Sequence, residues 1–125
     1  MSNRDEVTMR IGEVTERTEM SFRTLRHYDE IGLVTPSART EGGFRLYTED
    51  DVARILLIRR MKPLGYSLDE MRELLDVVDA LAASPADTEL RARLETIRAG
   101  ATERREKLTR QVAMADEFLA QLGDI

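Results

Sequence analysis

The sequence predicts a mostly α protein: a winged helix-turn-helix head with a small β-hairpin wing, and a long C-terminal helix that forms an antiparallel coiled coil with a second copy. Residues 21–33 are typical of a short amphipathic helix, with Arg23, Arg26 and His27 mostly outside its apolar stripe. Residues 37–47 are typical of a hairpin with a Gly-Gly turn. Apolar residues repeat at three- and four-residue steps toward the C-terminus, which predicts the coiled coil.

Composition limits the classes of protein to which the 125-residue chain can belong. A hydrophobic share of 42% is sufficient for a core, and there is no run of about 18 apolar residues such as a membrane span requires. The absence of cysteine excludes disulfides and thiolate chemistry. Residues 1–6 lack the apolar core of a signal peptide. We therefore expect a cytoplasmic protein with no membrane partner.

A basic helix followed directly by a basic hairpin is typical of proteins that place a helix in the major groove of DNA and a wing on the flanking backbone. The net charge of −5 argues against nucleic-acid binding until its distribution is considered. Residues 1–66 carry 11 basic and 11 acidic side chains, whereas residues 67–125 carry 8 basic and 13 acidic ones. The acidity thus lies mainly away from the basic elements, and we expect weak nonspecific binding with strong dependence on base or shape contacts.

Start and stop signals place the elements of the first half of the chain. Ser21 is a favourable N-cap for the amphipathic helix, and Gly32 suits its C-terminal end. A short helix near residues 12–17 and a tight turn at 18–20 precede it, which together predict a helix-turn-helix. Around this motif we expect an extended segment at 8–10, inward-facing Ile11 and Val14, a core position for Phe22, and hairpin strands at 37–40 and 44–47 joined by Gly42 and Gly43.

Three further helices are predicted from residue 48 onward, each with its own start signal. They run from a capping box at Thr48 and Asp51 to about residues 63–65, from a second capping box at Ser67 and Glu70 to about residue 83, and from an N-cap at Ser84 with Pro85 at the first helical position to about residue 121 or 122. The apolar face of the second helix is more typical of a core than of a ligand cavity. It consists of Leu68, Met71, Leu74, Leu75 and Val78.

The last predicted helix needs an apolar partner. A helix of about 35 residues spans roughly 50 Å, which is too long for a head of this size to cover. A second copy of the chain is the simplest partner. The apolar positions expected at the interface are Leu90, Leu94, Ile97, Ala101, Leu108, Ala115, Phe118 or Leu119, and Leu122, with Arg104 and Gln111 at two of the intervening steps.

Three segments together resemble the MerR family of bacterial transcription regulators. They are Arg-Thr-Leu-Arg-His-Tyr-Asp-Glu-Ile-Gly-Leu at 23–33, Gly-Gly-Phe-Arg-Leu-Tyr-Thr-Glu-Asp-Asp-Val at 42–52, and Leu-Gly-Tyr-Ser-Leu-Asp-Glu-Met at 64–71. The resemblance covers about residues 8–80 and continues more loosely through the long helix. It implies a dimeric regulator, many relatives of which untwist a promoter with an over-long spacer so that polymerase engages both promoter elements, while some repress.

The resemblance also implies a set of DNA-binding residues. They are Arg23, Thr24, Arg26, His27 and Tyr28 on the recognition helix, and Arg39, Arg45 and Tyr47 in the wing. In the wing, the two arginines would reach the backbone or minor groove and the tyrosine would bond a phosphate. His27 stands where many family members have a second aromatic residue.

The implied partners are double-stranded DNA with an inverted-repeat operator, a second copy of the chain, and RNA polymerase. Residues 1–80 would be the DNA-binding domain, and residues 81–125 the dimerisation helix with a short tail. We expect no cofactor and no metal: metal-sensing members carry cysteines after the long helix, and His27 is the only histidine. Drug-sensing members append a further domain, whereas here only residues 123–125 follow the predicted helix.

Other functional classes remain as alternatives. An architectural or recombination-accessory protein would use the same winged head, and a protein-interaction coiled coil would retain the fold without binding DNA. An enzyme is not expected, because no nucleophile paired with a base is visible. Gly42 and Gly43 lack the following Gly-Lys of a nucleotide-binding loop, so a hairpin turn is the better interpretation.

Overall fold

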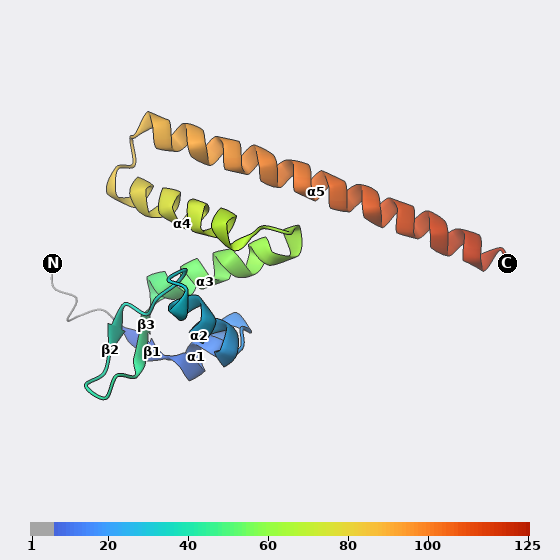
Figure 1. The fold of residues 1–125 in the computed structure, drawn as a ribbon. Coiled ribbons are helices and arrows are strands. Elements are labelled where there is room, and N and C mark those ends of the chain that lie inside the picture. Colours follow the sequence, from blue (N-terminus) through green and yellow to red (C-terminus); the bar gives the residue numbers. More distant parts are fainter. Residues whose placement is uncertain (1–6) are drawn as a thin grey trace. The chain divides into compact units, whose positions relative to one another are not determined.

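The computed structural model describes residues 7–125, which form two compact units: one ends at Leu75 and the other runs from Asp76 to Ile125 (Figure 1). The prediction of a mostly helical protein with a small sheet and a long C-terminal helix is confirmed. In chain order the elements are β1 (Thr8–Arg10), α1 (Ile11–Thr18), α2 (Phe22–Glu30), β2 (Ala38–Arg39), β3 (Arg45–Thr48), α3 (Glu49–Met61), the 3-10 turn η2 (Lys62–Leu64), α4 (Leu68–Ala83) and α5 (Thr88–Gly123).

A helix-turn-helix forms where the sequence predicted it. α1 extends one residue beyond the predicted 12–17 at each end, and Glu19 follows it with a φ of 56°. The buried Thr18 hydroxyl donates to the Val14 carbonyl oxygen (2.7 Å) and accepts from the Met20 backbone N–H (3.3 Å). These bonds close the turn, so that α2 begins after only three intervening residues.

The wing is part of a three-stranded antiparallel sheet with the strand order β1-β3-β2. The predicted extended segment at 8–10 is β1, which pairs with β3 so that Met9 lies opposite Tyr47. At the hairpin tip, the Gly43 N–H donates to the Thr40 carbonyl oxygen (2.9 Å). Gly43 has a φ of +83°, a conformation that glycine adopts at little cost.

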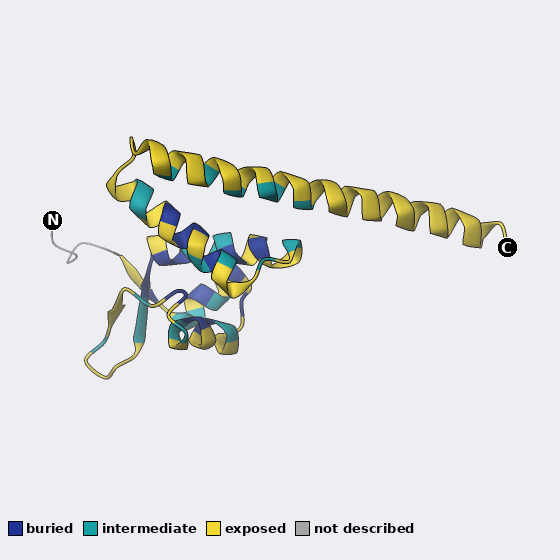
Figure 2. Cartoon of the chain, turned by 45° about the horizontal axis from the view of Figure 1, so that its top comes forward, coloured by how far each residue is buried: buried dark blue, intermediate teal, exposed yellow. Residues whose placement is uncertain are grey.

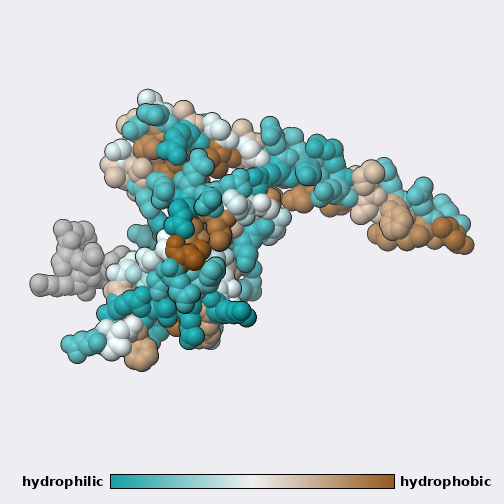
Figure 3. Space-filling view, in the orientation of Figure 1, coloured by the Kyte–Doolittle hydropathy of each residue, from teal (hydrophilic) through white to brown (hydrophobic). Residues whose placement is uncertain are grey.

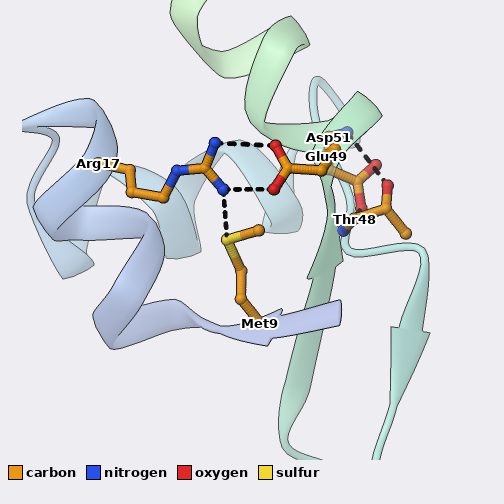
Figure 4. A network of polar contacts seen from close by, with 5 residues as sticks. All are labelled: Met9, Arg17, Thr48, Glu49 and Asp51. Atoms are coloured by element: carbon orange, nitrogen blue, oxygen red, sulfur yellow. Dashed lines mark hydrogen bonds and ion pairs between the residues drawn. The ribbon is translucent and has the colours of Figure 1, made fainter. Parts of the chain in front are cut away.

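Asp51 fastens the wing to the first turn of α3. Its Oδ2 accepts hydrogen bonds from the backbone N–H groups of Thr48 (2.9 Å) and Ser37 (3.0 Å), and its Oδ1 accepts from the Ser37 hydroxyl (2.9 Å). The Thr48 hydroxyl accepts from the Asp51 N–H, which completes the predicted capping box (Figure 4). The Ser37 N–H is bonded to Asp51 and not to a neighbouring strand; β2 covers only residues 38–39 of the predicted 37–40, and β3 covers 45–48 where 44–47 was predicted.

Arg17 connects α1 to the start of α3 on the surface of the same unit. It donates to Glu49 Oε1 (2.6 Å) and Oε2 (2.8 Å), and also to the Met9 sulfur (3.4 Å) (Figure 4). The shared hydrogen bond is the main cause that raises the pKa of Arg17 and lowers the pKa of Glu49. Both side chains are exposed, so water screens the pair and its contribution to stability is small.

α4 begins as predicted but buries a slightly different face. Ser67 and Glu70 exchange two hydrogen bonds between side chain and backbone, which confirms the second capping box. Most of the predicted apolar face is buried. The exceptions are Val78, which is 37% exposed while Val77 is buried instead, and Leu68, which is exposed at the first residue of the helix.

The predicted N-cap at Ser84 is wrong. The Ser84 N–H still donates to the Ala80 carbonyl oxygen at the end of α4, so this residue terminates one helix and does not begin the next. Asp87 is the N-cap of α5, because its Oδ1 accepts from the Leu90 N–H (3.0 Å). α5 consequently runs for 36 residues, from Thr88 to Gly123.

Buried residues are concentrated in the helix-turn-helix, the sheet, α3 and part of α4, whereas every residue of α5 is exposed or half-buried (Figure 2). The largest fully buried side chains include Tyr47, Leu25, Ile55, Ile58 and Leu75. The first unit therefore has its own core, and α5 presents most of its surface to the surroundings.

One predicted core residue of the helix-turn-helix is misplaced. Val14 is fully buried and Ile11 half-buried, but Phe22 is 46% exposed. The cause is geometric: residues three apart on a helix are rotated by about 60° relative to one another, so Phe22 lies about 120° around α2 from Tyr28. Leu25 and Tyr28 are buried, and Phe22 falls outside their stripe.

We expect Asp51→Ala to lower the free energy of unfolding by about 2–4 kcal/mol, because it removes a helix cap and deprives the Ser37 and Thr48 N–H groups of their acceptor. Urea unfolding followed by circular dichroism measures this loss. Asp50→Ala, which changes an exposed acid in the same turn, is the matched control and should cost less than about 0.5 kcal/mol. Equal losses in the two variants would mean that only negative charge at the helix terminus matters.

Candidate nucleic-acid interface

α2 presents a basic face opposite its buried side. Leu25 and Tyr28 point into the core, whereas Arg23, Arg26 and His27 are exposed. Within residues 7–125, neither Arg23 nor Arg26 forms an ion pair or a side-chain hydrogen bond. Both guanidinium groups are therefore available to an anionic ligand.

Both ends of α2 are fixed by hydrogen bonds. At the N-terminus, the predicted cap is confirmed: the Ser21 hydroxyl oxygen accepts from the Thr24 N–H (3.0 Å) and donates to the Thr24 hydroxyl (2.9 Å). At the C-terminus, Arg72 of α4 donates to the carbonyl oxygens of Ile31 (3.0 Å) and Gly32 (3.1 Å). A cation at this end complements the partial negative charge of the helix dipole. α4 therefore helps to set the orientation of α2.

Asp29, near the C-terminus of α2, joins this helix to the wing. Its Oδ2 accepts from Arg45 Nε (2.7 Å) and from Arg39 Nη2 (2.8 Å). Arg39 also donates through Nη1 to the Gly43 carbonyl oxygen at the hairpin tip (3.3 Å). One carboxylate oxygen thus connects the helix to both wing arginines that the sequence singled out.

The electrostatics of this cluster favour an ionised Asp29. Burial opposes ionisation, but the hydrogen bonds from Arg45 and Arg39 outweigh it, so the pKa of Asp29 lies below its ordinary value. The Asp29 side chain is only 10% exposed, whereas the Arg45 and Arg39 side chains are 25% and 46% exposed. The arginines, rather than the acid, are therefore accessible from outside.

Two of the predicted contact residues are buried. Tyr28 is 3% exposed and Tyr47 is 1% exposed. The Tyr47 hydroxyl has no hydrogen-bond partner within the described part of the chain, and burial raises its pKa above the ordinary value. A phosphate contact through this hydroxyl would require it to leave its buried position, so its role stays a prediction.

A cavity of about 1100 Å³ lies beside α2 in the first unit. Its wall includes Phe22, Arg26 and His27 of α2, together with Tyr66, Leu68 and Met71 near the start of α4. Phe22 and Leu68, two exposed apolar residues that the sequence had placed in the core, both line it. The cavity therefore adjoins the basic face of α2.

The structure brings the predicted residues together in two groups within one unit. Arg23, Arg26 and His27 share the exposed face of α2, with the half-buried Thr24 beside them. Arg39 and Arg45 lie opposite each other on paired strands of the wing. Tyr28 and Tyr47 belong to neither group, because both side chains are buried in the core.

Sequence reasoning missed the residues that hold these groups in place. Asp29 is separated by ten and sixteen positions from its two arginine partners, and Arg72 by about forty from the carbonyls it binds. No periodicity or motif connects positions so far apart. The only available signal was the acid at the end of a basic helix, which is unusual because helix C-termini favour cations.

Between residues 7 and 125 there is no group of three or more histidine, aspartate or glutamate side chains placed to hold a metal ion. In the same range, no helix is both long and apolar enough to span a bilayer.

Comparison with known proteins connects this geometry to a family. Residues 9–77 match the family described as MerR HTH family regulatory protein, and residues 52–125 match the one described as MerR, DNA binding. Over 68 residues the chain is 46% identical to the HTH-type transcriptional regulator ZntR of Escherichia coli K12. That match covers 54% of this chain and 48% of the relative, so the chain spans about half the length of this curated relative.

Solved structures agree with the sequence matches. A MerR family transcriptional regulator from Bacillus cereus has a TM-score of 0.67 and 30% identity, and the match covers 94% of this chain and 79% of that one. HiNmlR, described as a MerR family regulator lacking the sensor domain and bound to promoter DNA, has a TM-score of 0.68 and 25% identity, with 93% and 85% coverage.

These relatives are DNA-binding regulators and not enzymes, in agreement with the sequence prediction. The two family matches together extend from residue 9 to residue 125. The chain belongs to the MerR family of transcription regulators.

Proposed function

We propose that this protein is a dimeric, sequence-specific DNA-binding transcription regulator that binds an inverted-repeat promoter and distorts its spacer. The observation that carries the proposal is the exposed, unpaired Arg23 and Arg26 on α2, next to a wing whose arginines are tied to the same helix. Family membership supports it, and one relative of similar structure is described as bound to promoter DNA. The DNA-binding function is assigned to residues 1–80 and dimerisation to residues 81–125.

The dimensions of α2 suit the major groove. An α-helix with its side chains is about 10–12 Å across, and the major groove is about 12 Å wide, so a helix such as α2 can enter it. Arg23, Arg26 and His27 would then meet base edges or phosphates, while Arg39 and Arg45 would meet the flanking backbone. An arginine that pairs with guanine through two hydrogen bonds contributes about 1–3 kcal/mol of base discrimination, which would supply specificity to an acidic protein.

Dimerisation is proposed through α5. Its C-terminal half carries large exposed apolar residues, which Figure 3 shows gathered along one side near the end of the helix. They include Leu108, Val112, Phe118, Leu119 and Leu122. With Ala115 included, Leu108, Val112, Leu119 and Leu122 follow one another at steps of four, three, four and three residues, as in a coiled-coil seam, and Phe118 lies next to Leu119. Regulators of this family work as dimers, and two antiparallel copies of α5 would cover both seams.

A dimer with two heads calls for an operator with two related half-sites. If the heads do not match the spacing of straight B-form DNA, binding must bend or untwist the duplex, at a cost of about 1–6 kcal/mol for a bend. Such a distortion would align the two elements of an over-long promoter for RNA polymerase. We place this activity in the cytoplasm. The architectural alternative is not favoured, because the relatives are regulators.

We expect Arg26→Ala to weaken operator binding by about tenfold or more, because it removes a charged contact in the major groove. The operator is first selected from a random DNA pool, and affinities are then measured by fluorescence anisotropy. Arg60→Ala, which removes an exposed arginine from α3, is the charge-matched control and should retain most of the affinity. Selection of unrelated sequences without twofold symmetry would contradict the proposed function.

We expect the double substitution Val112→Asp and Leu119→Asp to convert the dimer into a monomer, because each change places a charge in the apolar seam. Sedimentation at micromolar concentration measures the mass. Arg110→Asp changes the charge by the same amount on the opposite side of α5 and should leave a dimer. A monomeric unsubstituted chain under these conditions would rule out the dimer.

A further inference from the structure

The pairing of β2 with β3 creates an electrostatic problem in the wing. Arg39 and Arg45 are register partners, so two positive charges lie directly opposite each other on neighbouring strands. Like charges in this position destabilise a sheet. Asp29 resolves the conflict, because both guanidinium groups donate to its Oδ2. The negative charge comes from α2. The contacts that offset the repulsion between the two arginines therefore also hold the wing against this helix.

The two arginines use the carboxylate differently. Arg39 engages both of its terminal nitrogens within the chain, one with Asp29 and the other with the Gly43 carbonyl oxygen. Arg45 donates to Asp29 through Nε alone. Within residues 7–125, the Nη1 and Nη2 atoms of Arg45 have no hydrogen-bond partner. Arg45 is thus anchored at one edge, with its pair of terminal nitrogens available to a second anion.

We propose that Asp29 is a positioning residue for DNA binding, which holds the Arg45 guanidinium through Nε so that its two terminal nitrogens bind a backbone phosphate. Arg39 serves mainly as a brace between α2, Asp29 and the hairpin tip. This inference rests on the proposed DNA-binding function and adds to it a residue that makes no DNA contact of its own. A guanidinium binds phosphate well through two parallel N–H groups, which is the geometry that the Nε anchor leaves open.

The opposite role for Asp29, as a competitor that neutralises the wing arginines, fits the geometry less well. A competitor would occupy the terminal nitrogens of Arg45, and these are open. The Asp29 side chain is also only 10% exposed, whereas the Arg45 side chain is 25% exposed. Loss of the carboxylate would leave two facing cations that repel each other, and the wing would lose its fixed relation to α2.

The test compares Asp29→Asn with Glu41→Gln, which removes one exposed acidic charge from the same hairpin without breaking an ion pair. Asp29→Asn should weaken operator binding about tenfold or more. The slope of log affinity against log salt should fall by about 0.9 for each head, or about 2 for a dimer, because one phosphate contact is lost per head. Glu41→Gln should leave the slope unchanged and the affinity equal or slightly higher.

A double-mutant cycle separates positioning from a general structural role. Asp29→Asn should add little to the loss caused by Arg45→Ala, since both remove the same phosphate contact, but should add fully to the loss caused by Arg23→Ala. Arg45→Lys should resemble Arg45→Ala, because lysine cannot be anchored at one edge and still offer two parallel donors. Backbone amide NMR shifts of β2 and β3 should show that the strands remain paired in each variant.

Several outcomes overturn the inference while leaving the proposed function intact. Tighter operator binding by Asp29→Asn, with a steeper salt dependence, would identify Asp29 as a competitor for the arginines. The positioning role of Asp29 would also be refuted if the affinity losses of Asp29→Asn and Arg45→Ala added fully. It would be refuted as well if Asp29→Asn changed affinity and salt dependence no more than Glu41→Gln does. Failure of the unsubstituted protein to bind any selected DNA would instead refute the proposed function.

A measurement without DNA tests the anchor itself. Because the pKa of Asp29 is lowered in the folded state, its ion pairs stabilise the fold fully at neutral pH and lose that effect as the pH falls below about 4. The charged groups that face Asp29 are Arg39 and Arg45, and the Tyr47 hydroxyl is coupled to it electrostatically. The difference in urea midpoint between the unsubstituted chain and Asp29→Asn should therefore shrink on acidification. A difference that stays constant from pH 7 to pH 3 would overturn the anchor.

Discussion

The contact of Asp29 with Arg39 and Arg45 couples two elements that would otherwise be independent, a helix and a hairpin. A two-stranded hairpin of this length has little stability by itself. Here it gains a third strand from β1, a hydrogen-bonded attachment to α3 through Asp51, and an ionic attachment to α2 through Asp29. The ion pairs of Asp29 therefore hold α2 and the wing in a fixed relation within the first unit.

Charge is divided along the chain in a way that suits this arrangement. The first 66 residues are neutral in sum, and the surplus of acid lies beyond them. Within the first unit, the acids Asp29 and Asp51 are largely buried and bonded, while Arg23 and Arg26 are exposed and unpaired. An acidic protein can therefore offer a locally positive surface, and the surplus acid elsewhere would limit attraction to DNA at large.

Local signals in the sequence predicted most of the fold, because caps, turns and periodicity depend on residues within a few positions of one another. The capping boxes at Thr48 and Ser67 are examples. Prediction failed at Ser84 and Asp87, where two possible N-caps lie close together. It also failed at Phe22, because successive three-residue steps rotate around the helix and place this side chain outside the buried stripe. The candidate site was predicted as a set of cations. Its supporting contacts were not, because they join residues that only the tertiary fold brings together.

The bond from Arg72 to the end of α2 has a mechanical consequence. Its guanidinium donates to the carbonyl oxygens of Ile31 and Gly32, so α4 and α2 are joined by two hydrogen bonds from one side chain. Any partner that tilted α4 would pull on the carbonyl end of α2. A displacement of α4 would therefore be transmitted to the C-terminal end of α2 through these two hydrogen bonds and not through the wing.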